Sequence, residues 1–149
     1  MKQNKPLPEI VFFSKSVMGA IGSELEKIGF KLLSNDMNGS WIAITYRREN
    51  MFIKVQGSVD YRDDLSYYNI VLGSGESENI SEWYSIALWQ LIRAIEQGSM
   101  AKEYVFPTGK DVDKCLKKAS LDLLKYGKTF LNGDFTIFNE IVKKQNGGN

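Results

Sequence analysis

The chain has 149 residues, of which 43% are hydrophobic and 25% are charged, with 19 Lys and Arg against 18 Asp and Glu. This profile is typical of one globular domain, and a formal net charge of +1 creates no overall field that would attract nucleic acid or an anionic membrane. The chain contains no histidine and a single cysteine, which excludes Ser-His-Asp triads, histidine-based zinc sites and disulfides within the chain.

The N-terminus shows no targeting pattern. Its longest apolar run, Ile10–Phe13, is much shorter than the core of a signal peptide, and no stretch of the chain approaches the ~20 apolar residues needed to cross a bilayer. We therefore expect a cytoplasmic protein that does not bind membranes. Residues 1–8 carry Pro6 and Pro8, and we expect this polar lead-in to be flexible.

The first periodic segment predicts a helix from Ser14 to Ile28, followed by Gly29 at the position of a left-handed C-cap. Its apolar stripe consists of Val17, Ile21, Leu25 and Ile28. Gly19 and Gly22 lie inside this helix, where glycine indicates either a weaker helix or close packing against a neighbour.

Four short segments rich in β-branched and aromatic residues follow, separated by turn-forming residues. They cover residues 30–33, 41–47, 51–57 and 67–72. We predict that they form a four-stranded antiparallel meander, with turns at residues 35–39 and 48–50. One face of this sheet is more apolar than the other, so helices must cover it.

The strongest helical periodicity lies in residues 81–96. Ile86 and Trp89 fall opposite its main stripe, which gives the predicted helix a second apolar side for another helix or for self-association into a homo-oligomer. A third helix is predicted from Asp111 to Gly127, with Cys115 in its apolar stripe as a small core residue.

The last predicted helix is capped by Asp134 and carries Phe135, Phe138 and Val142, and we expect residues 146–149 to be flexible. The predicted fold is therefore a single α+β domain spanning residues 1–149. It has an N-terminal helix, a four-stranded antiparallel meander, and three C-terminal helices packed on the sheet.

Two segments resemble ligand sites weakly. The run from Val71 to Gly75 leads out of a strand as phosphate-binding loops do, but no third glycine follows, and Glu76 and Glu78 would repel an anion. Asp60, Asp63 and Asp64 cluster without calcium-loop spacing. The cluster is most simply a solvated loop, and a metal-dependent enzyme using these acids and Glu76 is the alternative. We expect no metal, no cofactor and no enzymatic activity.

Charge is distributed unevenly along the chain. The net charge is +3 over residues 1–56, −5 over residues 57–92 and +3 over residues 93–149. The acidic middle region also holds three tyrosines before Trp83 and Tyr84 follow. Solubility and helix-dipole compensation explain part of this pattern, but carboxylates among aromatic residues are also typical of protein interfaces that select a basic partner. The candidate contact residues are Asp60, Tyr61, Asp63, Asp64, Glu76, Glu78 and Glu82. The same acids disfavour nucleic acid by repulsion.

A family resemblance points in the same direction. The segments that carry it are residues 25–30, which end in Gly29-Phe30, then residues 42–46, 52–55 and 68–73, and the pair Trp83-Tyr84. Together they resemble small bacterial α+β proteins, some of them predicted immunity proteins of polymorphic toxin systems. The resemblance spans residues 17–95 and implies no catalytic residue. It implies a binding protein that neutralises a toxin by occlusion, and a self-associating structural or phage-derived component is a further alternative.

Overall fold

The computed structural model describes residues 4–60 and 66–147. Within these residues, the chain forms a six-stranded antiparallel sheet in the order β1-β2-β3-β4-β5. The sixth strand, β6, also pairs with β4, at Tyr67 and Tyr68, whereas β5 pairs with the other end of β4, from Val71 to Ser74. The strands are β1 Lys31–Asn38, β2 Trp41–Arg48, β3 Met51–Ser58, β4 Tyr67–Ser74, β5 Tyr84–Ala87 and β6 Tyr104–Val105. The α+β class and the meander of the first four strands are confirmed, and two short strands extend the sheet beyond the prediction.

The N-terminal helix is longer than predicted. It runs through α1 (Pro8–Val17), the π-helical turn η1 (Met18–Gly22) and α2 (Ser23–Lys27), so it begins at Pro8 and not at Ser14. Proline fits the first helical turn, where a missing N–H costs nothing. Ahead of the helix, the backbone N–H of Leu7 donates to the carbonyl of Gly39 at 3.0 Å, which joins the lead-in to the β1–β2 turn.

The first strand extends to Asn38, through most of the segment predicted to be a turn. Only Gly39 and Ser40 separate it from β2, and Gly39 has a φ of +60°, which glycine adopts without strain. Residues 35–38 are mostly of types that often form turns. The strand tolerates them because β1 lies at the edge of the sheet, where polar side chains can remain in contact with water.

The predicted helix over residues 81–96 is wrong in its first half. The chain there forms a 3-10 turn, η2 (Ile80–Glu82), then β5, and only afterwards α3 (Leu88–Ile95). Ile86 lies opposite Leu72 in the sheet and is 2% exposed, so it belongs to the core and does not share a helix face with Trp89, which lies in α3. Pairing with the otherwise free edge of β4 stabilises an extended conformation that outweighs the helical periodicity.

The C-terminal part holds η3 (Gly109–Asp111), α4 (Val112–Tyr126), α5 (Lys128–Leu131) and α6 (Thr136–Gln145). The predicted helices after Asp111 and Asp134 are confirmed, and α5 is an addition. Cys115 is exposed on α4, so its predicted place in the core is wrong. The N-cap of α6 is Phe135 and not the predicted Asp134, whose side chain accepts from the backbone N–H of Thr136 at 3.1 Å from just ahead of the helix.

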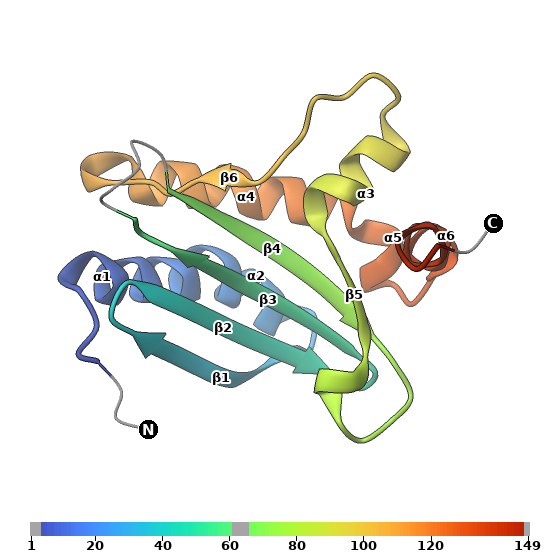
Figure 1. Ribbon diagram of the computed structural model, residues 1–149, viewed down its shortest axis with the longest axis horizontal. Coiled ribbons are helices and arrows are strands. Elements are labelled where there is room, and N and C mark those ends of the chain that lie inside the picture. The colour runs from blue at the N-terminus through green and yellow to red at the C-terminus, as the bar shows by residue number, and fades with distance from the viewer. Residues whose placement is uncertain (1–3, 61–65, 148–149) are drawn as a thin grey trace.

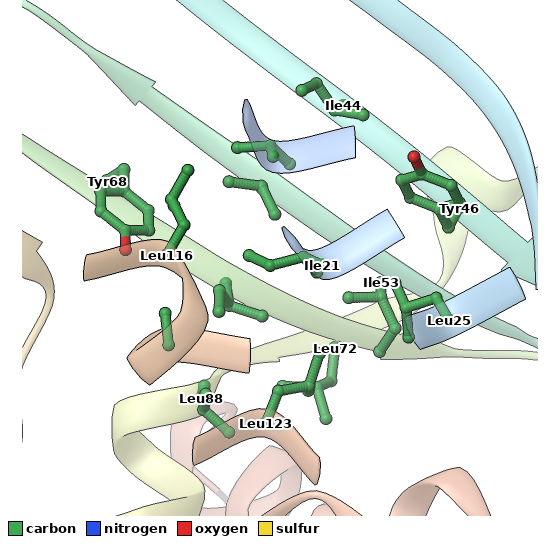
Figure 2. Packing of buried hydrophobic residues seen from close by; sticks show 14 of the residues in the cluster. Ile21, Leu25, Ile44, Tyr46, Ile53, Tyr68, Leu72, Leu88, Leu116 and Leu123 are labelled. Atoms are coloured by element: carbon green, nitrogen blue, oxygen red, sulfur yellow. The ribbon is translucent and has the colours of Figure 1, made fainter. Parts of the chain in front are cut away.

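The core lies between one face of the sheet and the long helices. Figure 1 shows α1 and α2 running behind β2 and β3, and Figure 2 shows Ile21 and Leu25 from this helix meeting Ile44, Tyr46 and Ile53 from the strands. Leu116 and Leu123 of α4 are likewise buried beside the sheet. Within the described residues, none of the helices is both long enough and apolar enough to span a membrane.

Candidate functional site

The opposite face of the sheet carries no helix of the described chain, but one loop folds onto it. This loop, residues 75–83, connects β4 to β5 and contains η2 (Figure 1). We call it, together with Tyr84, the acidic loop. A second small cluster of buried residues, Phe52, Val71 and Trp83, lies beneath it, with Ile80 packed against the cluster.

Trp83 fixes the acidic loop in place. Its indole ring stacks on Phe52 with centroids 6.2 Å apart, and its Nε1–H donates to the carbonyl of Ser77 at 2.8 Å. The guanidinium of Arg47 lies over the same indole, 5.1 Å from its centroid. With only 9% of its surface exposed, Trp83 serves as an anchor and not as a contact residue.

The two glycines of the run from Val71 to Gly75 have a packing role. A Cβ at Gly73 would lie 2.0 Å from Cε2 of Phe52, and a Cβ at Gly75 would lie 2.2 Å from Cδ1 of Trp83. Both rings therefore require glycine beneath them. Close packing against these rings is sufficient to explain the glycines, without a phosphate ligand.

Hydrogen bonds within the loop determine its shape. The side chain of Asn79 accepts from the backbone N–H of Ser81 at 3.1 Å and from the Ser81 hydroxyl at 2.7 Å. The Ser77 hydroxyl donates to the carbonyl of Asn79 at 3.0 Å. At the start of the loop, the backbone N–H of Gly75 donates to the carbonyl of Asn50. These polar groups of the loop therefore already have hydrogen-bond partners within the chain.

The side chains that the loop presents to solvent are acidic and aromatic. Glu76, Glu78 and Glu82 are all exposed, and within the part of the chain that the structure describes none of them has an ion-pair partner. Tyr84, directly after the loop, is 60% exposed. The sequence analysis included these three glutamates among the candidate contact residues but omitted Tyr84. Its position directly after Trp83, the only tryptophan of the loop, could have identified it.

The structure does not bring all seven predicted contact residues together. Asp60 follows β3, at the end of the β3–β4 pair where Ser58 lies opposite Tyr67, whereas Glu76 follows β4 at the end where Met51 lies opposite Ser74. With a rise of about 3.3 Å per residue, the eight-residue strands separate these ends by about 23 Å. Tyr61, Asp63 and Asp64 lie outside the described residues.

This separation also bears on the metal alternative, because Asp60 and Glu76 cannot ligate one ion across the length of the strands. Within residues 4–60 and 66–147, no group of three or more acidic or cysteine side chains is arranged to hold a metal.

Two stacked phenols, the buried Tyr68 and the half-buried Tyr104, lie on the helix-covered face, away from the acidic loop. Tyr104 donates its hydroxyl to Oδ2 of Asp122 at 2.9 Å and stacks on Tyr68 with centroids 5.2 Å apart. Burial raises the pKa of the Tyr104 phenol well above its usual value, and the hydrogen bond to Asp122 raises that pKa further. Burial likewise raises the pKa of Tyr68. Both groups therefore stay protonated at neutral pH.

Comparison of the chain with protein-family models, with curated proteins and with solved structures finds no match. The resemblance to immunity proteins therefore stays a prediction.

Proposed function

We propose that the protein is a non-enzymatic protein-binding module of the bacterial immunity type, which neutralises a basic toxin or effector by covering its working surface. The observation that carries this proposal is the acidic loop. Trp83 anchors it to the sheet, while Glu76, Glu78, Glu82 and Tyr84 are exposed to solvent.

The chemistry of these four residues suits a basic protein partner. Exposed carboxylates accelerate the encounter with a positively charged surface and discriminate against acidic partners. A tyrosine supplies a large contact area with few rotatable bonds, which makes it a common anchor at interfaces. Nucleic acid would be repelled by the same carboxylates.

A loop that is already ordered lowers the entropic cost of binding. The stacking of Trp83 on Phe52 and the hydrogen bonds of Asn79 hold the backbone in one arrangement before any partner arrives. We therefore expect the partner to bind a preformed surface. The glutamates around Tyr84 should contribute more to selectivity against other proteins than to the affinity for this partner.

Affinity capture from bacterial lysate with two matched variants tests this proposal. The loop variant reverses Glu76, Glu78 and Glu82 to lysine. The control variant reverses Glu26, Asp113 and Glu140 to lysine, which are exposed on α2, α4 and α6 and give the same change in net charge. We expect one basic protein, identified by mass spectrometry, to be retained by the wild type and the control and lost by the loop variant. Equal recovery with all three proteins would contradict the proposal.

A third variant separates the two acidic segments. Reversal of Asp60, Asp63 and Asp64 to lysine changes the net charge by the same amount, and the described member of this set, Asp60, lies at the opposite end of the β3–β4 pair. If the partner spans both ends of the sheet, this variant also loses it. If the partner meets the acidic loop alone, the variant retains it.

A further inference from the structure

The outer edge of β1 is a free strand edge from Lys31 to Met37, and at its last residue the backbone N–H of Asn4 in the lead-in donates to Oδ1 of Asn38 at 2.8 Å. β1 pairs with β2 on one side, and Figure 1 shows no described element beyond it on the other. Asn38 and Trp41 flank a two-residue turn, so Asn38, Asp36 and Ser34 direct their backbone groups toward β2. The backbone groups of Asn35 and Met37 consequently point outward, and within the described chain no backbone hydrogen bond joins them to a segment outside the sheet.

Large apolar side chains gather at the same edge. Leu32 is 46% exposed and Leu33 is 50% exposed at the start of β1, and Ile28 at the end of α2 is 37% exposed. An edge strand that combines unpaired backbone groups with exposed apolar side chains favours pairing with another strand.

We propose that this edge pairs antiparallel with β1 of a second copy of the chain. Two features favour a copy over an unrelated strand. The first is a β-bulge: Leu33 is an extra residue in β1 between Leu32 and Ser34. A regular strand would lose register past the bulge, whereas a second copy carries the same extra residue and stays in register.

The second feature is charge complementarity. When Leu32 pairs with Asn35 of the second copy, Lys31 lies opposite Asp36 of that copy, and two-fold symmetry repeats the pair. Lys31 and Asp36 are both exposed, and they share one sheet face because their partners in β2 are Arg47 and Ala43. The dimer would join the two sheets into one continuous sheet. It uses none of the acidic-loop carboxylates, so it stands independently of the proposed function.

Charge reversal tests the register. Sedimentation velocity on the full chain should show a wild-type dimer whose fraction rises over micromolar concentrations, as a small interface predicts. Lys31→Glu and Asp36→Lys should each raise the dimer dissociation constant about tenfold by creating like-charge pairs, and the double variant should restore it. Lys143→Glu on α6 and Asp113→Lys on α4 are the controls with the same charge changes as the two single variants, and they should have no effect. A wild type that stays monomeric throughout, or a double variant weaker than both singles, would overturn the proposal.

Cysteine cross-linking tests the edge itself. In a Cys115→Ser background, Ser34→Cys places two thiols beside the two-fold axis at about 6 Å between Cα atoms, within disulfide range. Ser58→Cys, at the exposed end of β3 and outside the proposed contact, is the control, because its two copies would lie more than about 20 Å apart. We expect a cross-linked dimer on mild oxidation for the first variant and not for the second. Equal cross-linking of both variants, or none of the first, would show that β1 does not pair as proposed.

Discussion

Two glycines in the N-terminal helix differ sharply in the space around them. A Cβ at Gly22 would lie 2.0 Å from the hydroxyl oxygen of Tyr46, whereas a Cβ at Gly19 meets nothing within 4 Å. Gly22→Ala should therefore destabilise the fold by about 1–3 kcal/mol through overpacking. Gly19→Ala should stabilise it by roughly 0.5–1 kcal/mol, because alanine is the better helix former. Urea unfolding of both variants measures the pair, and equal effects would contradict the packing of Tyr46 against this helix.

The buried phenols predict how stability changes at alkaline pH. Because folding raises the pKa of Tyr104 and Tyr68, the fold favours their neutral forms. Their contribution is fully present below the ordinary phenol pKa of about 10 and is lost as the pH rises above it. The free energy of unfolding should fall as the pH rises from 10 to 12, and less steeply in Tyr104→Phe, which cannot ionise. Identical slopes for the two proteins would contradict this origin.

At the scale of elements, Arg48 joins three separate parts of the chain. Its guanidinium donates to the carbonyl of Ile28 at 2.6 Å and to the carbonyl of Leu131, and it lies 4.7 Å from the ring centroid of Phe30. Arg48→Met keeps the apolar stem and removes both bonds. It should cost about 1.5–3 kcal/mol, since bonds to charged groups are the stronger kind. Arg48→Lys, with one ammonium in place of the planar fork, should recover only part of that loss in thermal unfolding.

Trp83 decides whether the acidic loop remains in place. Trp83→Ala removes the stack on Phe52 and the bond to Ser77, and should destabilise the protein by about 3–5 kcal/mol. Trp83→Phe removes the bond to Ser77 but keeps an aromatic ring, so the loop should stay ordered. Hydrogen exchange of residues 75–83 compares the two, with faster exchange expected in the alanine variant alone. Unchanged protection in Trp83→Ala would show that other contacts hold the loop.

Periodicity predicted the elements that depend on local signals. Val17, Ile21 and Leu25 of the predicted stripe are fully buried as expected, whereas Ile28 at its end is 37% exposed. Asp134 lies one residue ahead of the N-cap Phe135 and accepts from the backbone N–H of Thr136 in the last helix. The segment before α3, Tyr84–Ala87, could not be predicted in this way. The spacing of its apolar residues fits a helix, but in the structure it pairs with β4 as a strand. The competing interaction lies more than ten residues away in the sequence, so no local pattern reveals it.

At the scale of the whole molecule, residues close in sequence need not form one surface. The acids between residues 60 and 82 cluster along the chain, yet β4 carries the chain along the full length of the sheet between Asp60 and Glu76. Sequence reasoning identified the acidic character of the region but could not assign it to two ends of the sheet. The structure likewise places Ile86 in the core, which moves the candidate for self-association to the β1 edge.

The central claim is that the acidic loop steers a basic protein into contact. The most direct measurement is the association rate of the captured partner with the wild type and with the Glu76, Glu78 and Glu82 reversal variant, at increasing ionic strength. The account predicts that the wild-type rate is higher at low salt and falls steeply as salt screens the carboxylates, while the variant is slow and nearly independent of salt. Equal rates with equal salt dependence would contradict it and exclude the acidic loop from the interface.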